Sequence, residues 1–190
     1  MLAGKHAGAT RNLNLIFVSS CLRVLVFMKL AILSDIHDNI WKLAAALPRV
    51  AEAEAVLFCG DLCSPFTLDR LARGAAGKPV HVVWGNNEGD VRLMLKVIAE
   101  PGNVTLHGPL AELEFDGLRV AVNHYPEIAR RLAASGVYDL VCYGHDHVAH
   151  AERLPGGALL LNPGEVMGLY GRCTFAVFDT VQRATTFVDI

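Results

Sequence analysis

Polar residues that can bind a metal ion follow five successive apolar runs of the chain. They are Asp35 with His37, then Asp61, Asn86, His124, and His145 with His147. Carboxylate, imidazole and amide ligands suit Mn²⁺, Fe²⁺, Zn²⁺, Co²⁺ or Ni²⁺ better than Ca²⁺ or Mg²⁺. The set contains no Cys, which argues against a structural zinc site. Seven candidates exceed the needs of one ion, so we expect two ions that share a carboxylate. Such a pair, roughly 3.5–4 Å apart, can clamp an in-line displacement at phosphorus.

These apolar runs are short enough to be buried strands, and they must position the candidate ligands. The runs are residues 28–33, 55–59, 79–84, 118–123 and 139–143. In open α/β sheets, ligands bind at the carboxyl ends of the strands. Asp35 and His37 are two residues apart and can face the same side of a strand. Glycines at 60, 85 and 144 precede three of the candidates and allow a sharp turn or a close approach there.

The order of the expected elements indicates two packed sheets. Helices are predicted at 40–53, where Pro48 should shorten or kink the helix, and at 65–73, 89–100 and 127–135. Asp116-Gly117 lies between two strand-like runs and predicts a hairpin. Runs at 148–154, 158–161, 173–179 and 184–190 are expected to be antiparallel strands. A βαβ-like first half and a hairpin-rich second half favour two sheets packed face to face, with helices outside.

Composition bounds the class of protein. The chain has 190 residues, of which 53% are hydrophobic and 19% charged, so one globular domain is expected. The net charge of -2 gives no reason to expect nucleic acid or a membrane surface as a partner. Five Cys without a Cys-x-x-Cys pair indicate reduced thiols and a cytoplasmic location.

Residues 1–27 contain an apolar run at 13–27 that resembles part of a signal peptide. Arg23 interrupts the run, and no small-residue cleavage site follows it. The run is also too short to span a membrane. We therefore expect 1–27 to be a dispensable N-terminal extension and 28–190 to be a single domain, with export as the alternative.

The order of these motifs resembles the metallophosphoesterase, or calcineurin-like phosphoesterase, family. Asp-x-His, Gly-Asp, Gly-Asn-x-Glu, a lone His and Gly-His-x-His occur in the family's order, and the resemblance covers residues 28–190. The short chain and the Asn162-Pro163-Gly164 turn resemble the small bacterial and archaeal phosphodiesterase branch. The resemblance implies a four-layer α/β/β/α sandwich of two mixed sheets, with a dinuclear site at one edge.

Ligand roles and activity follow only from this resemblance. The first metal would be held by Asp35, His37, Asp61 and His147, and the second by Asp61, Asn86, His124 and His145. Asp61 would bridge the ions, and a bridging hydroxide would attack phosphorus, with Asp61, Asn86 and His124 as catalytic residues. Mn²⁺ is the expected ion, with Ni²⁺, Co²⁺, Fe²⁺ or Zn²⁺ as alternatives. The substrate would be a small phosphodiester, and small relatives often form homodimers.

Two departures from the family pattern concern the site. Asn87 stands where many members have a His that is thought to protonate the leaving group. Tyr125-Pro126 follows His124, where Gly is common. The alternative function is a non-catalytic scaffold, since one eukaryotic branch with a degraded metal site serves as a retromer subunit. Here every ligand position holds a suitable residue, which favours an enzyme.

Other polar residues have ordinary interpretations. His81 lies within a predicted strand and is expected to be structural, whereas His6 and His107 are expected to be solvated. His150 could line the cleft or lie on the surface. Asn39 could contact a substrate phosphate, although capping of the helix that begins at residue 40 already explains it.

Overall fold

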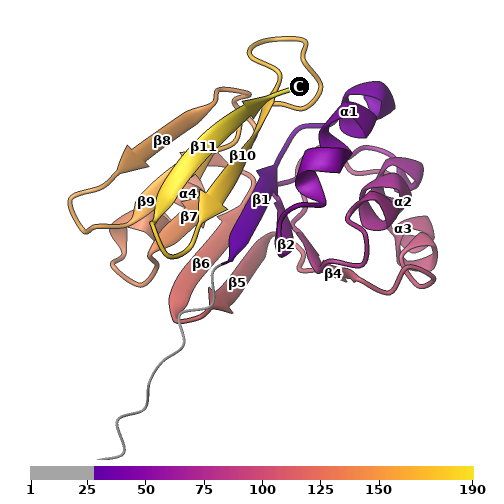
Figure 1. Ribbon diagram of the computed structural model, residues 1–190. Helices are drawn as coiled ribbons and strands as arrows, with labels where there is room; N and C mark the ends of the chain where they lie inside the picture. The colour runs from indigo at the N-terminus through magenta and orange to yellow at the C-terminus, as the bar shows by residue number, and fades with distance from the viewer. Residues whose placement is uncertain (1–27) are drawn as a thin grey trace, which may run out of the picture.

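The computed structural model describes residues 28–190 as two β-sheets packed face to face, with helices on both outer sides (Figure 1). The predicted α/β/β/α sandwich is therefore confirmed. The expectations for residues 1–27 lie outside the described residues. Among the residues described, no helix is long and apolar enough to cross a membrane.

The first sheet has the strand order β11-β10-β1-β2-β3-β4. Its strands are β1 (Lys29–Leu33), β2 (Ala55–Phe58), β3 (Val80–Val82), β4 (Val104–Leu106), β10 (Thr174–Asp179) and β11 (Ala184–Asp189). Strands β1 to β4 run parallel, and β10 pairs with β1 in the antiparallel direction. Figure 1 shows this pairing as the contact between the indigo start and the yellow end of the described chain.

The second sheet has the order β5-β6-β7-β9-β8. Its strands are β5 (Leu110–Phe115), β6 (Leu118–Asn123), β7 (Leu140–Cys142), β8 (His150–Arg153) and β9 (Leu159–Asn162). β5 and β6 form the hairpin that Asp116-Gly117 predicts. β6, β7 and β9 run parallel, so their carboxyl ends lie at the same edge.

Alternating side chains of the strands fill two separate cores. On β1, Leu30 and Ile32 face the second sheet, whereas Ala31 and Leu33 face the helices of the first sheet. This alternation is the two-residue period of a strand that is buried on both faces. The helices α1 (Ile40–Val50), α2 (Pro65–Gly74) and α3 (Val91–Val97) contribute side chains to that helix-side core. A single helix, α4 (Pro126–Ala134), covers the outer side of the second sheet.

Several predicted boundaries are wrong for local reasons. Helix α1 ends at Val50 rather than at 53, two residues after Pro48, which cannot donate a helical hydrogen bond. Helix α3 begins at Val91 because the Asp90 side chain accepts a hydrogen bond from the Leu93 amide at 3.1 Å. Strand β4 was not expected at all, because it has only three residues, none of them fully buried.

The expected antiparallel pairing of the last four strands is only partly correct. β9 pairs antiparallel with β8 on one side but parallel with β7 on the other.

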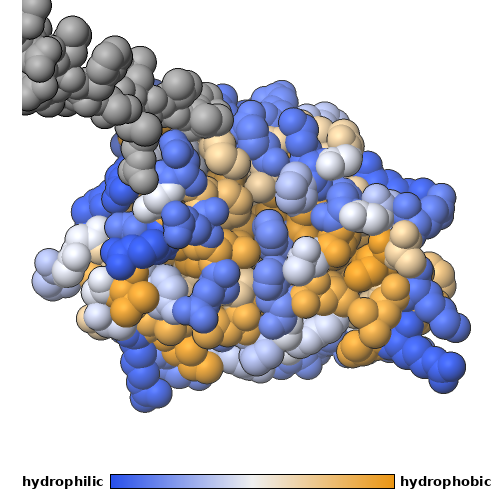
Figure 2. Space-filling model, turned by 90° about the horizontal axis from the view of Figure 1, so that it is seen from below, coloured by the Kyte–Doolittle hydropathy of each residue, from blue (hydrophilic) through white to orange (hydrophobic). Residues whose placement is uncertain are grey.

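Figure 2 views the molecule from below and shows hydrophobic residues interspersed with hydrophilic ones across that face. The candidate metal ligands do not lie on the strands themselves but in the loops that follow them.

Candidate metal centre

Backbone hydrogen bonds join the loop that follows β1 to the loop that follows β2, and the loop that follows β6 to the loop that follows β7. The amide of Asp35 donates to the Gly60 carbonyl at 3.0 Å, and the amide of His37 donates to the Asp61 carbonyl at 3.1 Å. The amide of Gly144 donates to the His124 carbonyl at 3.0 Å. The amide of His145 donates to Asp35 Oδ2 at 3.1 Å and so connects the two pairs of loops. All seven candidate ligands lie in loops at these strand ends.

One group of candidate ligands surrounds the buried Asp35 carboxylate. Asp35 Oδ1 lies 3.7 Å from His37 Nε2 and 3.5 Å from His147 Nε2. The two imidazole rings stack with their centroids 5.3 Å apart. His37 Nε2 also lies 3.4 Å from Asp61 Oδ2. Carboxylate oxygens and imidazole nitrogens thus converge on one small region.

A second group surrounds the other oxygen of Asp61. Asp61 Oδ1 lies 3.5 Å from His124 Nε2, and that nitrogen lies 3.0 Å from Asn86 Oδ1. His145 Nδ1 lies 2.9 Å from the same Asn86 oxygen and 3.2 Å from His124 Nε2. Asp61 therefore faces both groups, one oxygen toward each.

The donor atoms of these groups fit a cation. Asp35 Oδ1 and His37 Nε2 are buried and have no hydrogen-bond partner among the described residues. An uncompensated buried polar atom is expensive, and a bound cation would compensate both. His124 Nε2 and His145 Nδ1 both lie close to Asn86 Oδ1. A cation bound by all three atoms would also suit this arrangement.

Glycines let the backbone approach these side chains. A Cβ at Gly85 would lie 1.9 Å from Asp61 Oδ1, and one at Gly144 would lie 2.7 Å from Asp35 Oδ2. A Cβ at Gly60, where φ is +102°, would lie 2.7 Å from His124 Nδ1. Any larger residue would displace a candidate ligand, so the three glycines singled out in the sequence are required by the site.

Backbone strain is concentrated at the candidate ligands. Asp35, His37, Asp61, His145 and His147 have φ values of 52°, 43°, 66°, 74° and 61°. Residues other than glycine rarely adopt this left-handed region, and each instance costs on the order of 1 kcal/mol or more. Such strain persists where the surroundings hold it, and it clusters at functional sites.

Opposite charges shift the pKa values within the first group. Burial raises the pKa of Asp35, but the neighbouring His37 and Ser34 side chains and the imidazoles of His124 and His147 outweigh it and lower the pKa overall. The Asp35 carboxylate raises the pKa of His37, against the lowering effect of burial. The carboxylate is thus held in its ionised form, which is the form that binds metal.

Two glutamates, of which Glu88 is partly buried and Glu165 fully buried, support the candidate ligands, and neither is assigned a role by the sequence pattern. Glu88 accepts hydrogen bonds from the amides of Asp61 at 2.8 Å and Gly85 at 3.0 Å, and burial raises its pKa. Glu165 Oε2 lies 2.6 Å from His147 Nδ1. Glu88 could have been found from the Gly-Asn-x-Glu motif that contains it. Glu165 gives a weaker signal, an acidic residue just after the Asn162-Pro163-Gly164 turn.

Asn87 is also part of this arrangement. Its amide donates to Asp61 Oδ1 at 2.8 Å, and its Nδ2 donates to Asp61 Oδ2 at 2.9 Å. The residue that stands where many family members have a His therefore holds the Asp61 carboxylate in place.

Within residues 28–190 the other polar residues follow their predictions with one exception, and the prediction for His6 lies outside the described residues. His81 is structural, and its Nδ1 lies 3.0 Å from His107 Nε2, so His107 is half-buried against it rather than solvated. His150 is partly exposed on the edge strand β8. The Asn39 side chain accepts from the Lys42 amide at 3.1 Å and so caps α1 as expected.

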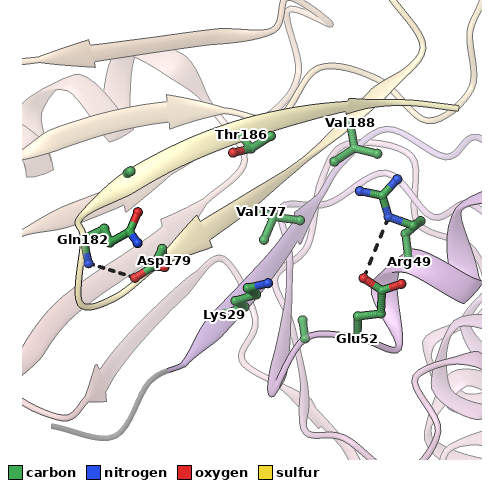
Figure 3. Close-up of a pocket in the computed structure, with 10 residues that line it drawn as sticks. Lys29, Arg49, Glu52, Val177, Asp179, Gln182, Thr186 and Val188 are labelled. Atoms are coloured by element: carbon green, nitrogen blue, oxygen red, sulfur yellow. Dashed lines mark hydrogen bonds and ion pairs between the residues drawn. The ribbon is translucent and has the colours of Figure 1, made fainter.

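A separate hollow lies at the opposite end of β1 (Figure 3). Figure 3 shows Lys29, Arg49, Glu52 and Asp179 around it, between the end of α1 and the strands β1, β10 and β11. Arg49 lies 3.9 Å from Glu52, and Asp179 accepts from the Gln182 amide at 2.8 Å. None of the candidate ligands lines it, so it is not part of the metal centre.

Comparisons with known proteins agree with this geometry. A phosphodiesterase of Methanocaldococcus jannaschii is 28% identical, over 82% of this chain and 95% of its own. The structure of an archaeal phosphodiesterase superimposes with a TM-score of 0.78 and 26% identity, over 86% of this chain and all of that one. These names are consistent with a hydrolase that acts on phosphoric esters.

A structure of Vps29 from Entamoeba histolytica shares the fold, with a TM-score of 0.57 and 19% identity over 86% of this chain and 99% of its own. The family model for the calcineurin-like phosphoesterase superfamily domain matches residues 28–183. With the fold, the strand-end ligand motifs and this match in agreement, the chain belongs to the calcineurin-like phosphoesterase superfamily.

Proposed function

We propose that the chain is a metal-dependent phosphodiesterase that acts on small diesters and binds two divalent ions, with Mn²⁺ as the expected metal. The proposal rests on the position of Asp61, whose two oxygens lie 3.4 Å from His37 Nε2 and 3.5 Å from His124 Nε2. One buried carboxylate between two sets of donors is the arrangement that a pair of ions requires. Such a pair would supply a hydroxide nucleophile near neutral pH and would neutralise charge on the phosphoryl oxygens.

The residues of the chain then have separate roles. Asp35, His37 and His147 would hold the first ion. Each offers one possible ligand atom, and these three atoms lie within 4.8 Å of one another. The second ion would be held by Asn86, His124 and His145. Asn87 orients the shared carboxylate, since both of its donors end on Asp61.

The environment of His124 supports its role as a ligand despite the unusual Tyr125-Pro126 that follows it. Its Nδ1 lies 2.7 Å from the Cys59 carbonyl oxygen, so Nδ1 carries the proton and Nε2 is left as the ligand atom. A ring nitrogen that donates to a carbonyl fixes the tautomer of a metal-binding histidine.

Metal analysis and a substrate panel test the proposal. Protein loaded with Mn²⁺ and desalted should hold close to two ions per chain. It should hydrolyse bis(p-nitrophenyl) phosphate with Mn²⁺, Ni²⁺ or Co²⁺ faster than with Mg²⁺, and faster than it hydrolyses p-nitrophenyl phosphate. A stoichiometry fixed at zero or one in excess metal would contradict the dinuclear site. Two bound ions with no hydrolysis of any ester would favour the scaffold instead. A cytoplasmic location and a homodimer stay predictions.

A further inference from the structure

A hollow opens directly beside the first group of candidate ligands. It is lined by His37, Asp38, Asn39, Trp41, Met167, Gly168 and Leu169. His37 belongs to both the hollow and the proposed metal centre. A diester whose phosphorus lies at the centre would therefore place one of its two substituents in this hollow.

Two large apolar side chains are exposed on the walls of the hollow. The Trp41 side chain, in the first turn of α1, is 77% exposed, and Leu169, in the loop between β9 and β10, is 65% exposed. Tyr170 follows Leu169 and packs the edge of its ring against His147, with centroids 5.3 Å apart. Large exposed apolar side chains that gather beside a polar centre indicate a binding surface.

Hydrogen bonds hold the two walls in fixed positions. Asn39 Nδ2 donates to the Met167 carbonyl at 2.8 Å, while its Oδ1 caps α1. The Met167 amide donates to the Asp35 carbonyl at 3.0 Å. The loop that carries Leu169 is therefore tied both to the helix that carries Trp41 and to the candidate ligand loop. The hollow is already formed before a ligand enters.

The charge of the hollow indicates what it can hold. No Lys or Arg is among the residues that line it. The Asp38 carboxylate already accepts from the Ser64 amide at 2.9 Å and from Thr67 Oγ1 at 2.6 Å. The nearby Lys42 Nζ donates to the Ile190 carbonyl at 3.0 Å. A second phosphate would find no cation in the lining, whereas a neutral planar group could stack on the exposed indole.

We propose that this hollow is a subsite for an aromatic ring carried by the diester, stacked on Trp41 and bounded by Leu169. The inference rests on the proposed phosphodiesterase function and deepens it. The ring can come from a nucleobase or from a simple aryl ester, because both offer the same flat, uncharged face.

Competitive inhibition by phosphate monoesters tests the subsite. The assay is hydrolysis of bis(p-nitrophenyl) phosphate by the Mn²⁺-loaded protein, with methyl phosphate, phenyl phosphate and a nucleoside 5′-monophosphate as inhibitors. At least one aromatic ester should bind at least about tenfold more tightly than methyl phosphate, as stacking on an aromatic side chain allows. The tighter of the two aromatic esters identifies the source of the ring.

Variants separate stacking from a general loss of binding. Trp41→Ala should remove the advantage of the aromatic esters and leave the inhibition constant of methyl phosphate unchanged, whereas Trp41→Phe should keep most of the advantage. Phe66→Ala is the matched control, since Phe66 is 68% exposed on α2 and does not line the hollow. Equal inhibition by all three esters in the unaltered protein would overturn the subsite. So would an unchanged advantage in Trp41→Ala.

Failure of the subsite is distinguishable from failure of the proposed function. If no ester is hydrolysed, the phosphodiesterase proposal fails, and binding is measured instead. Phenyl phosphate and the nucleoside monophosphate should then quench the tryptophan fluorescence of the Mn²⁺-loaded protein. Trp41→Phe should abolish the quenching, because the one other tryptophan, Trp84, does not line the hollow. Equal quenching in both proteins, or none in either, would overturn the subsite.

Discussion

Nδ1 of His147 lies 2.6 Å from Oε2 of Glu165, a carboxylate that is fully buried. The other oxygen of Glu165 accepts hydrogen bonds from the amides of Tyr170 and Gly171 at 2.7 and 2.6 Å. With Nδ1 bound in this way, Nε2 of His147 is the nitrogen that faces Asp35. Glu165 thus orients the candidate ligand His147 and also holds the loop that borders the hollow beside Trp41.

Glu165→Gln should weaken metal binding. Glutamine keeps the size of the side chain, and its oxygen can still accept from the two loop amides. Its NH₂ group would then face His147 Nδ1 and force the proton onto Nε2, the nitrogen that would bind the metal. Loss of such an outer partner typically lowers metal affinity about 10–100-fold. Titration calorimetry with Mn²⁺ measures this, with Glu152→Gln on the edge strand β8 as the control. Equal affinities in both variants would show that Glu165 does not orient His147.

Asp61→Asn should abolish turnover and weaken the binding of both ions. An amide cannot neutralise the charge between two cations, and its NH₂ group would face the donors of Asn87. The loss of kcat should exceed the roughly 100-fold typical of outer partners. Elemental analysis and steady-state kinetics measure the two effects, and a thermal melt checks that the variant folds. His81→Gln is the control and should leave turnover nearly unchanged. Normal turnover of Asp61→Asn in saturating metal would rule out the bridge.

The missing histidine at position 87 predicts a steep dependence of the rate on the leaving group. General acid catalysis is typically worth about 10²–10⁴-fold, and it matters most for poor leaving groups. Aryl diesters should therefore react much faster than alkyl ones, and Asn87→His should flatten the dependence. The measurement is kcat/KM for a series of substituted phenyl diesters with both proteins. A shallow dependence in the unaltered protein would mean that another group already donates the proton.

The His81–His107 pair should make the fold sensitive to acid. Burial lowers the pKa of both residues, and the charge of His107 lowers that of His81 further. The unfolded chain therefore binds more protons below its histidine pKa of about 6.5, so the free energy of unfolding should fall as the pH drops below that value. The slope should stay below about 1.4 kcal/mol per pH unit for each residue, because each binds at most one proton and both are partly exposed.

The variant His81→Gln isolates this effect. It removes one titrating group and the repulsion on the other, so its free energy of unfolding should change less between pH 7 and pH 5. Urea unfolding at several pH values measures the difference. Parallel pH profiles for the two proteins would show that the pair does not contribute.

A chain that begins at Met28 should fold and turn over like the full chain. The family match begins at residue 28, and every candidate ligand lies after it. Comparison of solubility, thermal melting and kcat/KM for the two chains measures this. A loss of any of the three would show that residues 1–27 contribute to the folded protein.

The sequence predicts the site better than its surroundings, for a physical reason. Asp35, Asp61 and His145 each follow an apolar run, and that local pattern is enough to place them at a strand end. Glu165 could not be assigned in this way, since its role depends on a contact with His147 from another loop. The His81–His107 contact is missed for the same reason, because it joins β3 to the residue after β4, and β4 is too short to leave a pattern.

The hollow beside the centre illustrates the same limit. In the sequence, nothing distinguishes Trp41 from other surface residues of its helix, and Leu169 lies in a loop without a periodic pattern. The hydrogen bond from Asn39 Nδ2 to the Met167 carbonyl ties the two walls to each other, and it joins segments far apart in the sequence. By contrast, the alternation of Leu30, Ala31, Ile32 and Leu33 between two cores follows directly from a strand buried on both faces.

The pairing of β1 with β10 has a consequence for how the protein folds during its synthesis. Lys29 lies opposite Asp179, so the strand that leads into Asp35 has one neighbour from early in the chain and one from near its end. Closing so long a loop carries an entropy cost, and contacts between distant segments slow folding. On the ribosome, the first sheet would stay open along β1 until the β10–β11 hairpin emerged. The proposed metal centre would then assemble only after β10 has emerged, because β10 completes the pairing of the strand that leads into Asp35.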